Sequence, residues 1–496
     1  MNTHTFNPPI RARGCVLALV VLLLGAAPAP AAGPARHLFL DPAFLQEVNG
    51  AALHVNPPQQ REIVIRPDQP WEQLMISFFL TVRDEEGKLR MWYICRDKAN
   101  AANVAYAEST DGVTWVKPKL GIADYHGSKE NNLVGIPFVS GMVFRDPKAK
   151  PGQEYVYLAN ADQKHGIVCY RSPDGLHWGD RQTLLPFRAD TQNVVFWDEP
   201  HGCYVLYLRG WNVGQDWNAR LRKVVRLTLA DLSKPVAIKS SGSGVNPTKP
   251  RDLPRIDDEM PTVLAADERD PKNTDVYNIS AQPYPLDPRW YVGFPSFLLR
   301  ERSISDGRLE VQFVGSRDGI VWQRYDRPPY VAPGLTGSES PNVVFMGTGL
   351  VMRGDEIWQY GTGFESRHGD VAARKRKTDG VIYRYVQRVD GFVSLDFAAT
   401  EGKCVTAPVK VDGARLLLNV DTGALGVLRV GLLDADGKPL AGFSADECAV
   451  LRTNSTHAEV AWKGANAVSS LQGREVRLLF TGSRAKLYSF RFEGEL

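Results

Sequence analysis

The sequence predicts an all-β protein, a five-bladed β-propeller followed by a C-terminal β-sandwich. Two observations lead to this fold class. The pattern Ser-x-Asp-Gly-x-x-Trp occurs at 109–115, 172–178 and 316–322, with a degenerate copy at Asp390-Gly391. The Asp-Gly pairs are 63, 144 and 72 residues apart, so a unit of about 65 to 70 residues repeats five times if one copy has diverged near 230–233. The residues after 390 lack this repeat but alternate in the manner of strands.

Each repeat unit is expected to be a four-stranded antiparallel meander. Strand patterns at 104–108 and 167–171 run directly into Asp-Gly, which favours a tight hairpin turn. Two further strand patterns lie upstream of each Asp-Gly pair. Five such meanders arranged around an axis form the propeller, which we place at residues 67–390.

The remaining segments complete the predicted organisation. Residues 391–496 alternate in short strands, as in Arg415–Val420 and Glu475–Phe480, which favours a β-sandwich. Residues 33–66 are expected to form an irregular lead-in to the propeller.

The N-terminus predicts a signal peptide at residues 1–32. Arg11 and Arg13 precede an apolar run, Val16 to Leu24, which is too short to span a bilayer, and small residues follow. We therefore expect a secreted or periplasmic protein with no membrane contact after cleavage, the alternative being a retained anchor.

Composition excludes several function classes. Of the 496 residues 23% are charged and 43% hydrophobic, which is usual for a globular protein and not for a disordered or polytopic membrane chain. The formal net charge is only +3, so no nucleic-acid partner is expected. No His, Asp and Glu cluster has metal-ligand spacing, so no metal or cofactor is predicted. The oligomeric state is left open.

Four acidic residues occupy the same position in four of the five predicted blades. Glu72, Asp190, Asp275 and Glu339 each stand three residues before the same point of an innermost strand, while the second blade has Phe138 there. In a propeller these positions converge on the central channel. Crowded carboxylates shift one another's pKa, so one can serve as an acid and another as a base or nucleophile. The alternative is that acidic residues simply favour the loops leading into strands.

The loops that leave the second strands should reach the same mouth. Asn193 follows one of the four acids and recurs as Asn278 and Asn342 in two other blades. Arginine, tryptophan and histidine around a carboxylate ring suit sugar hydroxyls and ring faces, or acidic groups on sugars. The predicted substrate-binding residues are Arg96, Asp162, Arg209, Trp211, His368 and Asn193.

The chain resembles the five-bladed β-propeller glycosidases of glycoside hydrolase families 32 and 43, and within them uncharacterised secreted bacterial proteins. The residues that carry the resemblance are Leu38-Phe39-Leu40-Asp41, Pro70-Trp71-Glu72, Arg90-Met91-Trp92-Tyr93 and Asp190-Thr191-Gln192-Asn193. Arg145-Asp146-Pro147 matches a family 32 motif in letters, but it leaves an inner strand instead of entering one, so we interpret Asp146 as a turn residue. The nucleophile and acid motifs of that family have no clear match.

These observations predict a secreted glycoside hydrolase that cleaves an oligo- or polysaccharide. Asp190 is the expected nucleophile or base and Glu339 the general acid, while Asp275 and Glu72 stabilise or orient. The alternative is a non-catalytic carbohydrate-binding propeller, in which the four acids would lie far apart or pair with arginines.

Overall fold

The computed structural model describes residues 35–494, except 86, 138–139, 162–165, 187–188, 213–220, 237–259, 371–376 and 464–467. Strands make up nearly all the regular structure of these residues, so the predicted all-β class is confirmed. Three short 3-10 helices accompany them, η1 (Pro42–Phe44), η2 (Pro70–Glu72) and η4 (Val468–Leu471). Within the described residues no helix has the length and apolar character that a bilayer crossing needs. The predicted signal peptide, 1–32, lies outside the described residues.

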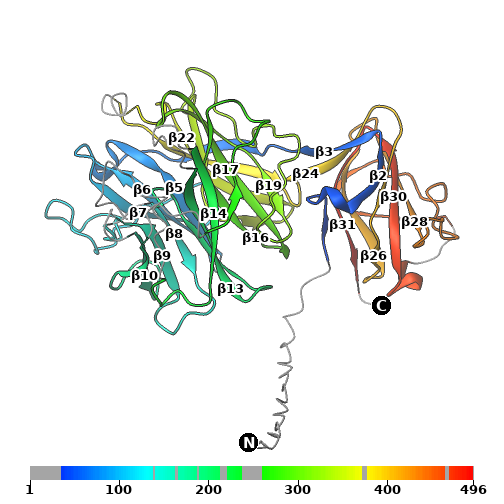
Figure 1. The fold of residues 1–496 in the computed structure, drawn as a ribbon, viewed down its shortest axis with the longest axis horizontal. Coiled ribbons are helices and arrows are strands. Elements are labelled where there is room, and N and C mark those ends of the chain that lie inside the picture. The colour runs from blue at the N-terminus through cyan, green and yellow to red at the C-terminus, as the bar shows by residue number, and fades with distance from the viewer. Residues whose placement is uncertain are drawn as a thin grey trace, which may run out of the picture. The chain divides into compact units, whose positions relative to one another are not determined.

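The described strands of the propeller part form four sheets (Figure 1). The largest has nine strands and contains two successive antiparallel groups joined by a parallel pairing of β18 with β20, so we divide the strands into five groups. They are group one, β5 (Met75–Glu85), β6 (Lys88–Arg96) and β7 (Ala102–Ser109); group two, β8 (Gly141–Arg145), β9 (Tyr155–Asn160), β10 (Ile167–Ser172) and β11 (Gln182–Leu185); group three, β12 (Val194–Asp198), β13 (Cys203–Asn212), β14 (Leu221–Leu229) and β15 (Thr262–Leu264); group four, β16 (Thr274–Tyr284), β17 (Asp287–Ser303), β18 (Asp306–Val311) and β19 (Val314–Ser316); and group five, β20 (Val343–Met346), β21 (Val351–Arg353), β22 (Glu356–Phe364), β23 (Val381–Arg388) and β4 (Gln59–Ile65).

The first strands of the groups surround a common axis. A cavity of about 200 Å³ is lined by residues in or directly after all five first strands. Neighbouring first strands also contact one another, and β20 closes the ring back onto β5. The contacts are Val143 N to Thr81 Oγ1 (3.2 Å), Val195 N to Met142 Sδ (3.2 Å), Ser280 Oγ to Gly347 O (2.7 Å) and Thr348 N to Leu80 O (2.9 Å). This arrangement is that of a β-propeller.

The Ser-x-Asp-Gly turns attach groups one, two and four to the group before each of them in the ring. In the turn at 172–178, Ser172 Oγ accepts from Gly175 N (2.9 Å) and Asp174 Oδ1 accepts from two further backbone N–H groups (2.8 Å each). The turn glycine then presents its carbonyl oxygen to an aromatic side chain of the preceding group. The donors are Tyr360 Oη to Gly112 (2.8 Å), Trp92 Nε1 to Gly175 (2.7 Å) and Tyr207 Oη to Gly319 (2.7 Å). The repeated motif is therefore a contact between groups as well as a turn.

A second recurring contact joins group one to two, two to three and three to four. An acidic residue at the end of a first strand accepts a hydrogen bond from a tyrosine hydroxyl of the next group. The pairs are Tyr155 and Glu85 (2.6 Å), Tyr204 and Asp146 (2.8 Å), and Tyr291 and Asp198 (2.8 Å). Asp146 also pairs with Arg171 (2.8 Å), so the Asp of Arg145-Asp146-Pro147 holds two groups together at the end of β8.

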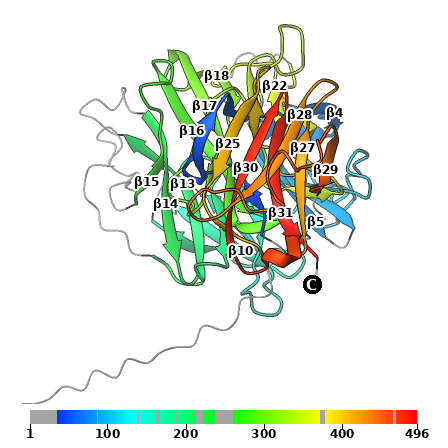
Figure 2. The same ribbon diagram turned by 90° about the vertical axis from the view of Figure 1, so that its right-hand side faces the viewer.

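The C-terminal part consists of two sheets packed face to face (Figure 2). One contains β29, β27, β31, β24, β3 and β1, and the other β2, β25, β30, β26 and β28. Their shared core includes Phe39, Leu418, Phe480 and Phe490, each at most 1% exposed. The strands are β1 (His37–Leu38), β2 (Leu45–Asn49), β3 (Ala51–Val55), β24 (Val393–Phe397), β25 (Gly402–Thr406), β26 (Val409–Lys410), β27 (Arg415–Asp421), β28 (Val427–Leu433), β29 (Asn454–Glu459), β30 (Glu475–Ser483) and β31 (Lys486–Glu493).

The lead-in differs from the expectation of an irregular segment. Its strand β4 pairs with β23 and supplies the outermost strand of group five, while β1, β2 and β3 pair with β31, β25 and β24 of the sandwich. Each partner strand lies more than 300 residues away in the sequence. The N-terminal segment therefore belongs to both parts of the fold.

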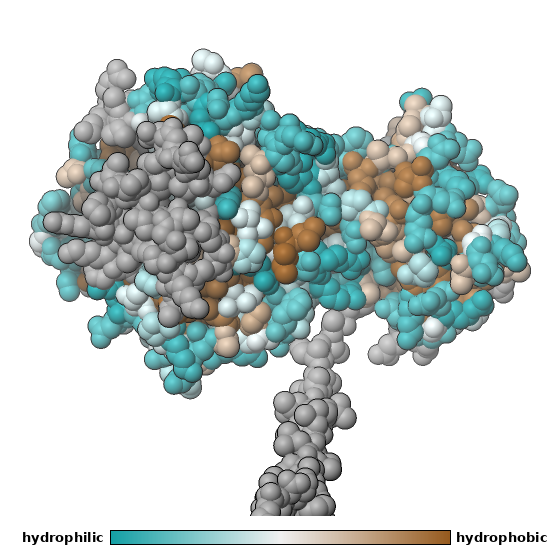
Figure 3. Space-filling view, viewed as in Figure 1, coloured by the Kyte–Doolittle hydropathy of each residue, from teal (hydrophilic) through white to brown (hydrophobic). Residues whose placement is uncertain are grey.

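Polar residues predominate on the face drawn in Figure 3, and apolar ones form small groups between them. Leu335 and Leu425 are the most exposed large hydrophobic residues of the described chain, at 86% and 74%. Isolated apolar residues of this kind are usual on protein surfaces.

Candidate active site

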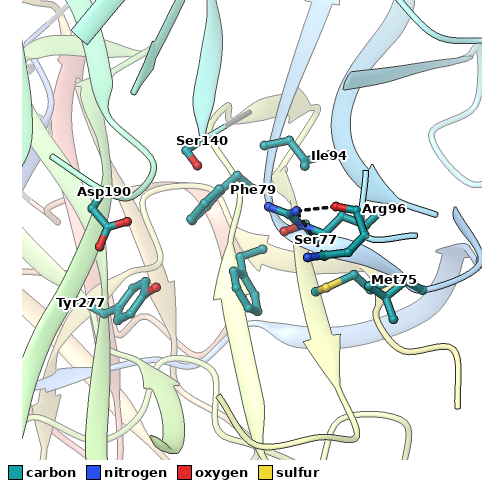
Figure 4. Close-up of a pocket in the computed structure, with 11 residues that line it drawn as sticks. Met75, Ser77, Phe79, Ile94, Arg96, Ser140, Asp190 and Tyr277 are labelled. Atoms are coloured by element: carbon teal, nitrogen blue, oxygen red, sulfur yellow. Dashed lines mark hydrogen bonds between the residues drawn. The ribbon is translucent and has the colours of Figure 1, made fainter. Parts of the chain in front are cut away.

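A cavity of about 290 Å³ lies where the first strands of four groups begin (Figure 4). Asp190 and Tyr277 lie on one side of it in this view and Arg96 on the other. The lining residues come from group one, from the segments before β8 and β12, and from β16. They are Leu74, Met75, Ser77, Phe78, Phe79, Ile94, Arg96, Asn100, Ser140, Asp190 and Tyr277.

Asp190 is the one of the four predicted acids that lines this cavity. Its side chain is 48% exposed, and its φ of +57° lies in the left-handed region that few residues other than glycine, Asn and Asp adopt. Ser140, on the same cavity wall, has a φ of +108°. Backbone strain of this kind clusters at ligand sites, because the surrounding structure must hold it in place.

Arg209 fixes the backbone behind Asp190. It is 2% exposed, and its Nη1 donates to Asp190 O (2.9 Å) and lies 3.6 Å from Asp190 Oδ2. Its Nε and Nη2 donate to Tyr277 O (3.1 and 2.7 Å). Burial lowers the pKa of Arg209, although Tyr277 and Asp190 oppose this effect. Arg209, which was predicted to bind substrate, thus positions two cavity residues and does not itself line the cavity.

Tyr277 and His368 form a hydrogen-bonded pair at the cavity wall. His368 Nε2 lies 2.9 Å from Tyr277 Oη, and His368 Nδ1 lies 2.6 Å from the carbonyl oxygen of Ser305. A carbonyl oxygen only accepts, so Nδ1 carries a proton and the variable proton lies between Nε2 and Tyr277 Oη. A neutral His368 therefore accepts from Tyr277 Oη, whereas a His368 that is also protonated at Nε2 donates to it and leaves the phenol hydrogen for another acceptor.

Several buried polar atoms beside the cavity have no hydrogen-bond partner among the described residues. They are Thr191 Oγ1, both side-chain polar atoms of Gln192, Asn193 Oδ1 and Asn278 Oδ1. Asn193, predicted to bind substrate, is fully buried and donates through Nδ2 to Thr191 O (2.9 Å). Buried polar groups are nearly always paired, so this unused hydrogen-bonding capacity marks the region around Asp190 as unusual.

Glu72 does not reach this cavity. Its side chain is fully buried, and its Oε2 accepts from Asp68 N, Gln69 N and Lys117 Nζ (3.0, 3.2 and 2.8 Å). Tyr93 Oη donates to its Oε1 (2.6 Å). Glu72 thus caps η2 and binds a lysine, which gives it a structural role.

Asp275 and Glu339 are also held by basic residues. Asp275 is fully buried between Arg222, which donates to it, and Arg300 at 3.7 Å. Glu339 is 47% exposed and pairs with Arg66 (2.9 Å), outside the cavity lining. The structure therefore brings neither residue into the cavity with Asp190.

The other predicted substrate-binding residues divide between cavity and core. Arg96 lines the cavity, whereas Trp211 is 1% exposed and stacks under Arg222, 4.8 Å from ring centre to guanidinium carbon. His368 is outside the cavity lining and forms a hydrogen bond with Tyr277. Asp162 lies outside the described residues.

Of the lining residues only Asp190 and Arg96 were predicted from the sequence, and those not predicted include Tyr277, Ser140, Phe78 and Phe79. Two adjacent phenylalanines in an innermost strand, Phe78 and Phe79, were the available signal. Among the described residues, no group of three or more His, Cys, Asp or Glu side chains is arranged to hold a metal ion.

No family model matches the chain, and no curated protein matches it. Several similar solved structures are glycoside hydrolases. One described only as a glycoside hydrolase has a TM-score of 0.44 and 12% identity, covering 67% of this chain and 92% of that chain. A glycoside hydrolase family 43 arabinoxylan arabinofuranohydrolase from Bacillus subtilis, in complex with cellotetraose, has a TM-score of 0.38 and 10% identity. The match covers 86% of this chain and 97% of that chain.

An N-acetylgalactosamine deacetylase from F. plautii, in complex with blood group B trisaccharide, is also similar. Its TM-score is 0.45 and its identity 14%, covering 69% of this chain and 97% of that chain. At TM-scores below 0.5, neither the activities nor the site residues of these proteins carry over to this chain.

Proposed function

We propose that the protein is a secreted glycoside hydrolase that binds one sugar of an oligo- or polysaccharide in the central cavity, with Asp190 as its catalytic carboxylate. One observation carries this proposal: Asp190 presents a half-exposed carboxylate, on a strained backbone, to a cavity at the propeller axis. The five strand groups are the five blades in this interpretation. Secretion rests on the sequence pattern of residues 1–32 alone.

The size and lining of the cavity support a sugar as ligand. Its volume of about 290 Å³ is at the lower end of the range for small-molecule sites, which suits a single ring. Phe78 and Phe79 offer apolar rings for a sugar face, and Ser77, Ser140, Asp190 and Tyr277 offer hydrogen-bonding groups.

Hydrolysis of a glycosidic bond needs two groups, one to activate water or attack the sugar and one to protonate the leaving oxygen. We assign the first role to Asp190. For the second we replace Glu339 with Tyr277, because Tyr277 lines the cavity. When both nitrogens of His368 are protonated, Nε2 donates to Tyr277 and the phenol hydrogen is directed to the cavity. Tyr277 then gives this proton to the leaving oxygen and regains one from Nε2, while Asp190 takes the proton of the attacking water.

A carbohydrate-binding protein without catalysis is the second candidate. All four predicted acids have a basic partner: Glu72 pairs with Lys117, Asp275 with Arg222 and Glu339 with Arg66, and Asp190 Oδ2 lies 3.6 Å from Arg209 Nη1. This is the arrangement expected of a propeller that binds a glycan without cleaving it.

The Asp190→Asn variant separates the two candidates. Asparagine tolerates the same positive φ, so the fold should be retained while the carboxylate is lost. Release of reducing ends from fructans, arabinans and sulfated algal glycans is measured for both proteins. We expect kcat on the cleaved glycan to fall by about 100-fold or more.

Asp436→Asn is the matched control, because Asp436 is exposed on the sandwich, and it should leave turnover unchanged. Undiminished turnover by the Asp190→Asn protein would rule out the assignment of Asp190. Binding of a glycan without cleavage by the unaltered protein would favour the second candidate.

A further inference from the structure

Arg96 ends β6 on the cavity wall opposite Asp190 (Figure 4). It is part of the antiparallel pair with Met75 of β5, so its position is fixed by the sheet. The residue is partly buried, and its side chain lines the cavity.

The guanidinium group of Arg96 has no carboxylate partner among the described residues. Its Nη1 donates to Asn100 O and Oδ1 (3.1 and 3.3 Å), and these are its only hydrogen bonds within the described chain. The neighbouring Asp97 is turned away, since its carboxylate accepts from Ala101 N (2.9 Å) and Tyr125 Oη (3.5 Å). Nε and Nη2 of Arg96 therefore keep unused donors beside the cavity.

The other buried arginines near the site have carboxylate partners. Arg222 contacts Asp275, and Arg209 lies 3.6 Å from Asp190 Oδ2. Burial lowers the pKa of Arg96, with no carboxylate to oppose it. A partly desolvated arginine without a counterion is unfavourable unless a ligand supplies the missing charge.

The charges around the cavity leave this site positive. The carboxylate of Asp190 is matched by Arg209 behind it, so the charge of Arg96 is not balanced from that side. The cavity thus has the carboxylate of Asp190 and the hydroxyl of Tyr277 on one wall and an unmatched planar donor, Arg96, on the other. A planar guanidinium group suits the paired oxygens of a carboxylate or sulfate.

We infer that the cavity binds an acidic sugar, one that carries a carboxylate or sulfate group, and that Arg96 binds this anion. The inference rests on the proposed function and adds the substrate class. The sugar hydroxyls face Asp190 and Tyr277, and the anionic substituent points to the far wall.

Binding of matched charged and neutral probes tests this inference. Isothermal titration calorimetry compares trigalacturonate with its methyl ester, which removes the charge at nearly constant shape, and a sulfated galacto-oligosaccharide with its desulfated form. We expect at least one acidic probe to bind about 10- to 100-fold more tightly than its neutral counterpart. The two pairs distinguish a carboxylate from a sulfate.

The preference should depend on Arg96. In Arg96→Gln it should be abolished, and in Arg96→Lys, which keeps the charge but loses the planar pair of donors, it should be reduced. Arg452→Gln, a change of the same kind at an exposed position of the sandwich, should preserve it. Circular dichroism and the melting temperature confirm that each variant is folded.

The inference is overturned if no acidic probe binds more tightly than its neutral counterpart, or if Arg96→Gln keeps the preference. In either case, cleavage of a neutral glycan that depends on Asp190 would leave the proposed function intact. If the unaltered protein prefers the acidic probe but cleaves no glycan, or if Asp190→Asn cleaves as well as the unaltered protein, the proposed function is contradicted while the inference about Arg96 stands.

Discussion

Glycine in each Ser-x-Asp-Gly turn serves two purposes at once. Gly175 has a φ of +76°, which side chains disfavour, and a Cβ atom there would lie 2.8 Å from Trp92 Cζ2 of the neighbouring group. Gly112 and Gly319 are as close to Tyr360 and Tyr207. The repeat therefore reflects packing between groups as much as turn geometry.

Gly175→Ala and Gly152→Ala separate these two effects. Gly152 has a similar φ of +81° but nothing within 4 Å of its added Cβ. We expect Gly152→Ala to lower the free energy of unfolding by about 1–2 kcal/mol through backbone strain. Gly175→Ala should lower it by about 1–3 kcal/mol more, because it also overpacks the contact with Trp92. Urea denaturation measures both, and equal losses would show that the contact with Trp92 is unimportant.

Single residues also show how much of the site could be predicted from sequence. The shared register of the acids indicated where β5, β12 and β20 begin, and it led to Asp190, but β16 begins at Thr274, before Asp275. The register could not show that Glu72 and Asp275 would be bound by Lys117 and Arg222, because these partners lie 45 and 53 residues away in the sequence. Tyr277 was missed because only the fold brings His368, 91 residues away, to its hydroxyl.

Among the elements, the N-terminal strands were the hardest to predict. The repeat and its turns indicated the strands of the five groups, since each pairs with a neighbour in sequence. The strands β1 to β4 have no such neighbour, and β4 pairs with β23 across more than 300 residues. Long-range pairing leaves no local signal in the chain, so an irregular segment was the natural expectation.

The pairing of β1 with β31 should make the fold sensitive to acid. His37 of β1 stacks on Phe490 of β31, with ring centres 4.5 Å apart. Burial lowers the pKa of His37 from 6.5 to about 4, and Arg289 and Arg317 add to this effect. Between these values the unfolded chain binds a proton that the folded chain does not, so stability falls as the pH drops from about 6.5 to 4.

His37→Phe should remove this dependence while keeping the stacked rings. As the pH falls from 7 to 4, the free energy of unfolding of the unaltered protein should decrease by up to about 3 kcal/mol more than that of the variant. Chemical denaturation at several pH values measures the difference. His126→Asn, at an exposed histidine, is the control and should follow the unaltered protein. Parallel curves for His37→Phe and the unaltered protein would contradict the role of His37.

At the scale of the whole molecule, the ring of first strands determines where the site lies. Because the five groups close on one axis, segments that begin near 75, 140, 190 and 277 meet at one cavity. Aromatic contacts from Tyr360, Trp92 and Tyr207 to the turn glycines hold neighbouring groups at this spacing. The site therefore depends on closure of the ring, in which the N-terminal strand β4 takes part.

The role of the central cavity is tested by a crystal structure of the Asp190→Asn protein with the glycan that the unaltered protein binds best. We predict a sugar in the central cavity, within hydrogen-bond distance of residue 190 and Tyr277 and against Phe78 or Phe79. A glycan bound only elsewhere, for example in the groove of about 730 Å³ lined by Tyr170 and Trp178, would contradict the account.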